Sequence, residues 1–411
     1  MENPESNDRN SLFLINYIVL SLKKKSMRIR ASILTLLILF FFITPSLQAQ
    51  NSVGINGQDT TINVITTAVP FLLIAPDPIS GAMGDVGVAT DPDANSTFWN
   101  PAKLAFINKS GGIGLTFTPW LKKFVDDMSV SYLTGFKKLD DQQAIGMSLT
   151  YFNLGDIQLT DGAGNSIGEF TPREFALSAT YSRQLSRKLS VGVTGRYIFS
   201  NLSGNITTSP VTDPKPGTSI AADIGVYYKS ELTVFQKQSQ LSYGASISNI
   251  GAKISYNSAD EEDFIPTNFR IGSALSSFLD PYNKLTFALD FNKLMVPTPQ
   301  PDGSERDKSL LSGMFGSFGD APGGFTEELQ EVSVSFGAEY EYKETFAIRA
   351  GYFYEHRNKG NRKYFTAGLG FKVDKLQFNF SYLVPQFQEH PLAETLRFGA
   401  ILDLSQLSDD N

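Results

Sequence analysis

The two histidines are the residues best suited to metal binding or acid–base catalysis in this chain, because it contains no cysteine. His356 and His390 lie in two separate predicted loops. A zinc site usually needs three or four ligands, and no Ser–His–Asp order in the sequence resembles a catalytic triad. We therefore expect solvated loop histidines, with no catalytic residue, no metal site and no cofactor. The sequence predicts a protein that is not an enzyme.

Composition and spacing exclude several other kinds of chemistry. Gly81, Gly84 and Gly87 recur at a spacing of three, but no Lys-Ser/Thr pair follows them, so they do not form a phosphate-binding loop. A net charge of -7 argues against nucleic acid as a partner, which requires clustered Lys and Arg. The lack of cysteine excludes disulfides, thiolate metal sites, cysteine nucleophiles and an N-terminal lipoprotein anchor.

The N-terminal region carries a targeting pattern. A basic run, 23–30, precedes an apolar stretch, 33–43, which is followed by helix-breaking Pro45 and the small residue Ala49. A charged region, an apolar region of this length and a small residue at its end predict a signal peptide. We expect residues 1–49 to be this signal peptide, with cleavage after Ala49.

A second apolar run, 12–22, lies upstream of the first. Each run is too short to span a bilayer as a helix, which needs about 20 apolar residues. We expect translation to start at Met27, so that residues 1–26 come from a misplaced start. A helical hairpin anchor is the alternative. No later segment is apolar enough to span a membrane as a helix.

Beyond residue 110, apolar side chains alternate with small or polar ones, which is the period of strands between two environments. For example, Ile145 and Met147 share one face of a predicted strand, and Gly146 and Ser148 share the other. A soluble sheet usually turns Lys and Glu to water, whereas charged residues are only 19% of this chain. The pattern predicts an all-β fold, a transmembrane outer-membrane β-barrel of antiparallel strands.

We count about fourteen such segments, and many have a length of about 9–13 residues, which suits tilted strands that cross a bilayer. They lie near 111–119, 127–137, 142–153, 173–185, 189–201, 218–230, 241–250, 267–279, 283–296, 331–342, 345–357, 362–373, 376–384 and 394–404.

The connections between these segments alternate between short and long. Outer-membrane barrels have short periplasmic turns and long external loops, and a β-sandwich has no reason to sort its loops in this way. The exception is 231–240, which occupies a short position but predicts a longer turn. An even number of strands then places both termini in the periplasm.

Residues 50–110 do not follow the strand pattern and are rich in proline and glycine. A segment of this kind before the first strand either hangs in the periplasm or folds into the lumen. Its apolar run at 69–74 favours packing over disorder. We therefore expect a plug in the lumen, followed by the barrel from 111 to 411.

Five charged residues within predicted strands, mostly on the less apolar face, are candidates for the lumen: Arg173, Arg196, Arg270, Asp290 and Arg349. An arginine that faces lipid costs roughly 2–4 kcal/mol at mid-depth. We therefore expect these side chains to point inward. There they either form salt bridges in a filled lumen or line a ligand pathway.

Two predicted external loops carry candidate contact residues. Asp260 and Glu261 begin an acidic cluster that precedes Phe264 in the fourth loop. It is either solvated, with loose cation binding at a lipopolysaccharide surface, or a contact for a partner protein. In the fifth loop, 297–330, apolar residues stand among glycines, and exposed apolar loops often mark partner sites. We expect a mobile arm that contacts a partner or folds over the barrel mouth, with these candidates: Leu311, Phe315 and Phe318.

The plug segment contains three recognisable stretches, 66–77, 81–90 and 98–103. Their motif residues are Pro70, Phe71, Gly81, Gly84, Asn100 and Pro101. Together these stretches resemble the PorV (LptO) family of the type IX secretion system of Bacteroidetes, within the wider group of FadL-like barrels. Further similar stretches spread the resemblance over most of the mature chain: 151–157, 195–198, 249–256 and 292–299.

The resemblance implies a FadL-like barrel of fourteen strands and a non-enzymatic role in secretion. Members of the family bind the C-terminal signal domains of secreted proteins. They take this cargo from a large translocon barrel, SprA or Sov, and pass it to an attachment complex that contains the sortase PorU. Outer-membrane lipid and lipopolysaccharide would surround the barrel.

Two other functions stay open at this point. FadL-like barrels move fatty acids or other hydrophobic compounds through a plugged lumen with a lateral opening. A lumen blocked by the plug and by Arg196, Arg270 and Arg349 would oppose such transport. A role in lipopolysaccharide modification is suggested by the family's second name, and the lack of a catalytic constellation argues against a direct enzyme.

Overall fold

The computed structural model describes residues 63–123, 125–160, 162–202, 215–256, 262–300, 303–386, 392 and 395–405. The expected signal peptide and the first residues of the expected plug, 50–62, lie outside the described residues. Within the described part of the chain, no helix is both long and apolar enough to cross a membrane.

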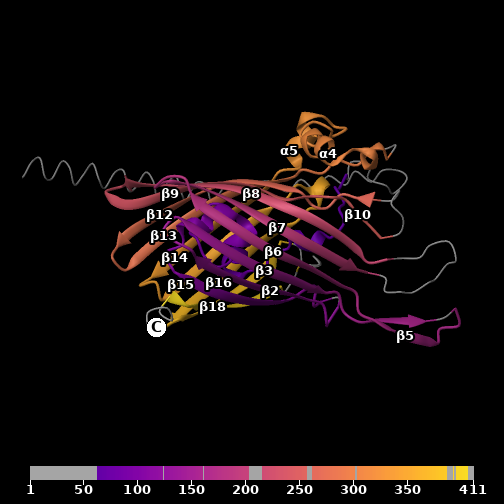
Figure 1. The fold of residues 1–411 in the computed structure, drawn as a ribbon, viewed down its shortest axis with the longest axis horizontal. Helices are drawn as coiled ribbons and strands as arrows, with labels where there is room; N and C mark the ends of the chain where they lie inside the picture. Colours follow the sequence, from indigo (N-terminus) through magenta and orange to yellow (C-terminus); the bar gives the residue numbers. More distant parts are fainter. Residues whose placement is uncertain are drawn as a thin grey trace, which may run out of the picture. The chain divides into compact units, whose positions relative to one another are not determined.

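Fourteen strands within the described residues close into one antiparallel barrel (Figure 1). Neighbours in the barrel are neighbours in the chain, and β1 closes the circle by pairing with β18. The strands are β1 (Gly111–Pro119), β2 (Ser129–Lys138), β3 (Gln143–Asn153), β6 (Arg173–Gln184), β7 (Leu189–Asn201), β8 (Gly217–Val234), β9 (Lys237–Gly251), β12 (Asn268–Asp280), β13 (Asn283–Leu294), β14 (Ser333–Tyr342), β15 (Phe346–Tyr354), β16 (Lys363–Val373), β17 (Leu376–Pro385) and β18 (Leu396–Asp403).

The fourteen predicted segments correspond to these fourteen strands, so the predicted barrel is confirmed. The expected long turn at 231–240 is wrong. Strands β8 and β9 continue to Val234 and from Lys237, and only Phe235 and Gln236 connect them. Both connecting residues have positive φ, 48° and 65°, as a tight turn between twisted antiparallel strands requires. Neither residue is the Asn or Gly that usually marks such a turn.

The strands alternate between an outward and an inward face. Ile145 and Met147 on β3 are 41% and 60% exposed on the outside, while the residues between them are buried. The outward side chains are large and apolar over the whole barrel wall. An apolar outer wall and a small, polar inner face are what a barrel in lipid requires.

The two ends of the barrel differ. At one end, which we call the turn end, short turns join the strands, and the strand termini Gly111 and Asp403 also lie there. At the other, the loop end, the connections are longer, and two of them form hairpins that the sequence pattern did not predict. The hairpins are β4 (Ile157–Thr160) with β5 (Ser166–Phe170), and β10 (Ile254–Ser255) with β11 (Glu262–Asp263). The labels β5 and β10 in Figure 1 mark the loop end.

The loop end also carries the helices of the fifth and sixth loops. These are η3 (Ser304–Asp307), α4 (Leu310–Gly316) and α5 (Phe325–Gln330) in the fifth loop and η4 (Arg357–Lys359) in the sixth. We call residues 303–330 the helical arm (Figure 1). The glycine-rich sequence of the arm forms these short helices, which the sequence pattern did not predict.

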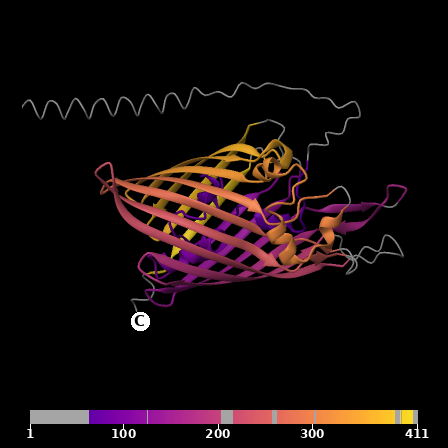
Figure 2. The ribbon, with the colours of Figure 1, turned by 90° about the horizontal axis from the view of Figure 1, so that it is seen from above.

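The described residues before β1 fill the barrel, as the expected plug should (Figure 2). They form four short helices: η1 (Pro70–Leu73), α2 (Pro78–Gly81), α3 (Ser96–Trp99) and η2 (Pro101–Phe106). Prolines occupy the first turn of three of these helices, where the missing amide costs nothing. Almost every plug residue from Ala75 to Ile107 is buried or half-buried, so the plug and the inner face of the wall form the core together.

Strand glycines make room for the plug backbone. A Cβ atom at Gly192 on β7 would lie 2.4 Å from the carbonyl carbon of Pro101, and one at Gly244 on β9 would lie 2.0 Å from the carbonyl oxygen of Val88. Any side chain at these positions would have to displace backbone. The inward glycines therefore set how closely the plug can approach the wall.

We predict that Gly192→Val pushes the plug from the wall and destabilises the barrel by about 1–3 kcal/mol, the usual cost of overpacking. Thermal unfolding in detergent micelles, followed by circular dichroism, measures this loss. Gly195→Val is the matched control, since Gly195 lies on the outward face of the same strand and a Cβ atom there meets nothing within 4 Å. Equal melting temperatures for the two variants would contradict the role of Gly192.

Candidate functional site

Asn100 joins the plug to itself and to the barrel wall. Its Oδ1 accepts from the Ala102 amide at 3.1 Å and so caps η2. Its Nδ2 donates to the carbonyl oxygens of Val88 and Val226, each at 3.0 Å. Pro101 follows at the first helical position, where no amide donor is needed. The Asn-Pro pair of the motif thus caps a helix and attaches it to β8.

Asp77 organises the first half of the plug. Its carboxylate caps α2 by accepting from the amides of Ile79 and Ser80 at 3.0 and 2.9 Å. It also accepts from Trp99 Nε1 at 2.7 Å, which fixes the indole ring in the middle of the barrel. Asp77 is fully buried, so each of these bonds satisfies an acceptor that water cannot reach.

Asp290 connects the plug to β13. This fully buried carboxylate accepts from the amides of Gly87 and Val88 at 2.8 and 2.9 Å. On the other side of the same turn, Lys103 Nζ donates to the Gly87 carbonyl at 2.8 Å and to Thr90 Oγ1 at 2.9 Å. Asp290 therefore holds the plug backbone, and it does not line a ligand pathway.

The remaining motif residues pack against the wall. Pro70 opens η1, and buried Phe71 stacks on Phe152 of β3 with ring centroids 6.3 Å apart. Gly84 has a φ of 72°, and its amide donates to Thr366 Oγ1 on β16 at 2.8 Å. A Cβ atom at Gly84 would lie 2.6 Å from backbone of β15, so no larger residue fits there.

Gly81 meets the wall at β18, two strands away from β16. A Cβ atom there would lie 2.8 Å from Nη1 of Arg397, which is itself buried and donates through Nε to the Ala75 carbonyl at 3.2 Å. The plug motif therefore consists of residues that make contact between plug and wall possible.

Two of the expected lumen charges form buried ion pairs. Arg196 Nη2 lies 2.7 Å from Asp223 Oδ2, and its Nη1 donates to Asn249. Arg349 Nε lies 2.6 Å from Glu339 Oε2. Both arginines point into the lumen, as predicted for charges that cannot face lipid. The same prediction for Arg173 is wrong, because this residue is exposed at the loop end of β6, where a charge can reach water.

Arg270 is different from these two. It is 6% exposed, and its Nε donates to Asn292 Oδ1 at 2.9 Å. Its guanidinium group lies over the rings of Trp99 and Phe98, 4.8 and 5.4 Å from their centroids. Among the described residues, no carboxylate oxygen lies within 4.0 Å of it. Arg270 is thus a buried cation that lies against aromatic rings and makes no close ion pair, while the carboxylates of Asp290 and Asp85 act on it from farther away.

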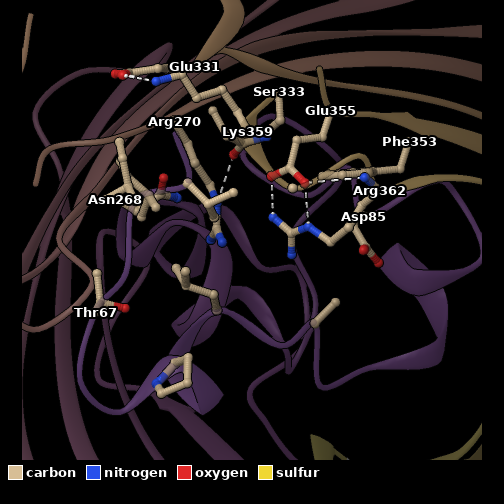
Figure 3. A pocket seen from close by; sticks show the side chains of 18 of the residues that line it. Thr67, Asp85, Asn268, Arg270, Glu331, Ser333, Phe353, Glu355, Lys359 and Arg362 are labelled. Atoms are coloured by element: carbon tan, nitrogen blue, oxygen red, sulfur yellow. Dashed lines mark hydrogen bonds and ion pairs between the residues drawn. The ribbon is translucent and has the colours of Figure 1, made fainter. Parts of the chain in front are cut away.

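The guanidinium group of Arg270 reaches into a cavity of about 400 Å³ at the loop end, which we call the loop-end pocket (Figure 3). One wall is the start of the plug, from Val64 to Ala75. The opposite wall comes from β12 to β16 and from η4. The pocket lies between elements far apart in sequence, so only the closed barrel with its plug inserted forms it.

A second cavity of about 430 Å³ lies at the turn end, lined by other residues that include Asp91, Lys284, Glu339 and Arg349. The two cavities share no lining residue. The plug lies between them, and its turns are bonded to the wall. The described lumen is therefore divided into two separate compartments.

The helical arm presents apolar side chains to the outside. These residues are between 48% and 77% exposed: Leu311, Phe315, Phe318, Phe325 and Leu329. Between the arm and the outward face of β12 and β13 lies an apolar groove of about 250 Å³. Phe318 packs edge-on against Phe269 of β12, with centroids 6.5 Å apart, so the groove opens beside the apolar outer wall.

A cluster of charges fastens the arm to the barrel rim. Lys293 on β13 lies 3.1 Å from Glu328 and also pairs with Glu331. Lys359 of η4 lies 2.5 Å from Glu327 and 3.0 Å from Glu331. Partial burial would raise the pKa of Glu327, but the bonded Lys359 lowers it below its ordinary value, so this carboxyl stays charged. We call these five residues the rim cluster.

The candidate contact residues of the fourth loop are either outside the described residues or buried. Asp260 and Glu261 lie outside the described residues. Phe264 is 7% exposed, which contradicts its expected role as an exposed contact. It is covered by Lys253, whose Nζ lies 4.4 Å from the ring centroid, and by Gly313 of α4, where a Cβ atom would lie 2.9 Å from the ring. Phe264 therefore anchors the arm to the fourth loop.

The histidines do not form a site within the described residues. His390 lies outside them, and His356 caps η4 by accepting from the Asn358 amide at 3.3 Å. Partial burial and the nearby Lys363 lower the pKa of His356, so it is neutral at pH 7. Among the residues that the structure describes, no group of three His, Asp or Glu side chains could hold a metal ion.

Sequence reasoning missed most residues around the loop-end pocket and the arm. Arg362, Glu355 and Asn292 line the pocket, and Lys293 and Glu331 belong to the rim cluster. All lie at or near the loop ends of strands. Charged residues at strand ends are common in any barrel, so the residue type alone does not identify a site residue. Only the contacts that these residues make across the barrel distinguish them from solvated residues.

A closed barrel with an apolar outer wall, a plugged lumen and its long loops at one end is an outer-membrane β-barrel. Residues 56–301, more than half of the chain, match the family model described as "Type IX secretion system protein PorV". The chain belongs to this family. The match is to a family of secretion proteins and to no family of enzymes.

Solved structures with a similar fold are distant. The toluene transporter TbuX of Ralstonia pickettii has 13% identity and a TM-score of 0.44, and the alignment covers 79% of this chain and 96% of that one. A FadL homologue of Pseudomonas aeruginosa has 11% identity and a TM-score of 0.39, with 83% and 99% covered. Similarity at this level assigns no ligand to this chain. A comparison with curated proteins gave no match.

We predict that Lys293→Gln releases α5 from the rim, because it leaves Glu328 and Glu331 with one cation fewer in a site that excludes water. Amide hydrogen exchange at 310–330 should become at least about tenfold faster, which corresponds to 1.4 kcal/mol of lost local stability. Lys284→Gln, which removes a comparable double ion pair with Asp91 and Glu341 at the turn end, is the control. Unchanged exchange in the Lys293 variant would show that the rim cluster does not hold the arm.

Proposed function

We propose that this protein binds the C-terminal signal domains of secreted proteins at the translocon and carries them to the surface attachment complex. The proposal follows from membership of the PorV family and from the expected partners, a SprA- or Sov-like translocon barrel and a PorU-like sortase complex. It places the loop end outside the cell and both chain termini in the periplasm.

The observation that carries the proposal is the exposed apolar surface of the helical arm. Five large apolar side chains are at least 48% exposed on an arm that Lys293, Lys359 and Phe264 hold in place, although Phe318 also contacts Phe269 of the wall. Water-exposed apolar groups of this number are costly unless a partner covers them, and an ordered arm loses little entropy on binding. Lipid covers the barrel wall, but an arm at the loop rim needs a protein partner.

Transport of hydrophobic small molecules is the second candidate, and the structure supports it less. The two cavities share no lining residue. The plug is held between them by the hydrogen bond that Asp290 accepts from the Gly87 amide and by the one that Asn100 donates to the Val226 carbonyl. A ligand would need the plug to leave its place before it could pass. Its passage would break several buried hydrogen bonds at once, each costing about 1–3 kcal/mol when left unpaired.

We predict that a tagged copy of the full chain, purified from native membranes in mild detergent, recovers the translocon barrel and proteins with C-terminal signal domains. Mass spectrometry of the recovered proteins measures this. An untagged strain serves as the control for proteins that adhere to the resin. Recovery of neither class from an intact membrane complex would refute the proposed role.

We predict that Phe315→Ser in the arm lowers recovery of these partners at least about tenfold, the loss expected when one central aromatic contact is removed. Phe235→Ser is the matched control, because Phe235 is 83% exposed in a tight turn at the opposite end of the barrel. Both variants should fold as the wild type does. Equal recovery with both variants would exclude the arm as the contact surface.

A further inference from the structure

The loop-end pocket contains one cation that has no ion-pair partner within 4.0 Å among the described residues. Its other ionic groups have partners. Arg362 makes two hydrogen bonds to Glu355, at 2.8 and 2.7 Å. Lys359 pairs with Glu327 and Glu331 in the rim cluster. The cation that remains is Arg270.

Asp85, a further carboxylate of the pocket, accepts from the Tyr364 hydroxyl at 2.5 Å and lies 3.7 Å from Arg397 Nη2. It lies more than 4.0 Å from the Arg270 guanidinium group, so Asp85 and the buried Asp290 attract that group only from a distance. Within the described residues, the two terminal nitrogens of Arg270 have no hydrogen-bond partner, although the side chain is only 6% exposed. Donors of a buried cation that stay unpaired are expensive, which points to a ligand that accepts from them.

The geometry points to a carboxylate as this ligand. A guanidinium group that is held by its Nε leaves two terminal nitrogens side by side, and this fork matches the two oxygens of a carboxylate. A carboxylate brings a single negative charge to the guanidinium group. A phosphate dianion would instead meet Asp85, Glu355 and Glu331 in the same cavity with a charge left over.

The lining favours a peptide over an acyl chain. Polar side chains from both walls reach the cavity, among them Thr67, Asn268, Asn292 and Ser333. An acyl chain would leave these groups unpaired, while a peptide backbone pairs with them. The cavity of about 400 Å³ is within the roughly 300–1,000 Å³ of ordinary ligand pockets and takes only the end of a chain.

The plug wall of the pocket offers further backbone partners. Residues Val64–Thr67 lie outside any helix or strand and are half-buried or exposed along the cavity. The segment is fixed at both ends, by the bonds from the Asn63 amide to Asn358 O at 3.1 Å and from the Ala68 amide to Phe264 O at 3.0 Å. Between these bonds, within the described residues, Val64–Thr67 make no backbone–backbone hydrogen bond. A peptide that lies along this segment can use its free amides and carbonyls.

We propose that the loop-end pocket binds the free C-terminal carboxylate of a peptide, with Arg270 as its counterion and Val64–Thr67 as the backbone along which the last residues lie. This inference rests on the proposed function, because a C-terminal signal domain ends in the free carboxylate of the cargo chain. It adds that the last carboxylate itself is recognised, in a pocket separate from the exposed face of the arm.

The test uses the full-length protein in lipid nanodiscs and one cargo signal domain in two forms. One form ends in its native carboxylate, and the other carries the same sequence with a C-terminal amide. Fluorescence anisotropy with a dye at the domain's N-terminus measures both affinities. We expect the amide to bind about tenfold to hundredfold more weakly, the loss for a charge-assisted hydrogen-bonded pair.

The variant Arg270→Gln should weaken binding of the carboxylate form by the same factor and leave the amide form unchanged. Arg270→Lys should recover part of the loss, since it restores the charge without the fork. Arg349→Gln is the control, because Arg349 lines the turn-end cavity and pairs there with Glu339. The amide comparison on the wild-type protein stays valid even if a variant folds poorly.

Three results would overturn the inference. Equal affinity of the wild-type protein for both forms would show that the C-terminal carboxylate is not recognised, while the proposed binding of cargo would stand. Binding of neither form would refute the proposed function together with this inference. The third result is that hexadecanoate displaces the signal domain while a peptide with an acetylated N-terminus and a free C-terminal carboxylate does not. If Arg270→Gln also abolished hexadecanoate binding, the pocket would be assigned to fatty acids instead.

Discussion

A polypeptide can fill this barrel only if every polar group that it carries into the lumen finds a partner there. Water is largely excluded around the plug, so a backbone amide left without an acceptor would destabilise the fold. The cost is about 1–3 kcal/mol, at least as much as one hydrogen bond contributes to stability. Asp290 receives two adjacent amides at the turn around Gly87. Thr366 Oγ1 accepts from the Gly84 amide and donates to the Ala82 carbonyl, each at 2.8 Å. Strand side chains thus replace the solvent that the plug backbone would otherwise need.

The same pairing decides where the protein can act. A plug bonded on all sides divides the lumen, so the two cavities are separate and the middle of the barrel is closed. The proposed working surfaces are therefore those at the loop end, namely the arm and the loop-end pocket. Arg270 lies in the inner wall as the other lumen arginines do, but it contacts the ring of Trp99 and makes no close ion pair.

The sequence predicted the barrel well and the sites poorly, for physical reasons. Strands between lipid and a polar lumen must alternate, so periodicity located all fourteen. The tight turn at Phe235 was missed, because its two positive φ angles are imposed by the flanking strands and not by turn residues. Burial of Phe264 depends on Gly313, which is distant in the chain. The unpaired state of Arg270 depends on which groups lie across the barrel, and no local pattern reports that.

The loop-end pocket and the plug are linked by their construction. The chain that forms one wall of the pocket, from Val64 to Ala75, continues directly into the plug, and Trp99 of the plug lies beneath Arg270. A barrel without its plug would therefore lack both the wall and the ring that holds the guanidinium group. A ligand in this pocket binds only the plugged state, and by linkage it stabilises that state by its own binding free energy. A ligand in the loop-end pocket would thus stabilise the plug in its closed position. This is the behaviour expected of the proposed carrier, which would hold its cargo at the surface without opening the membrane.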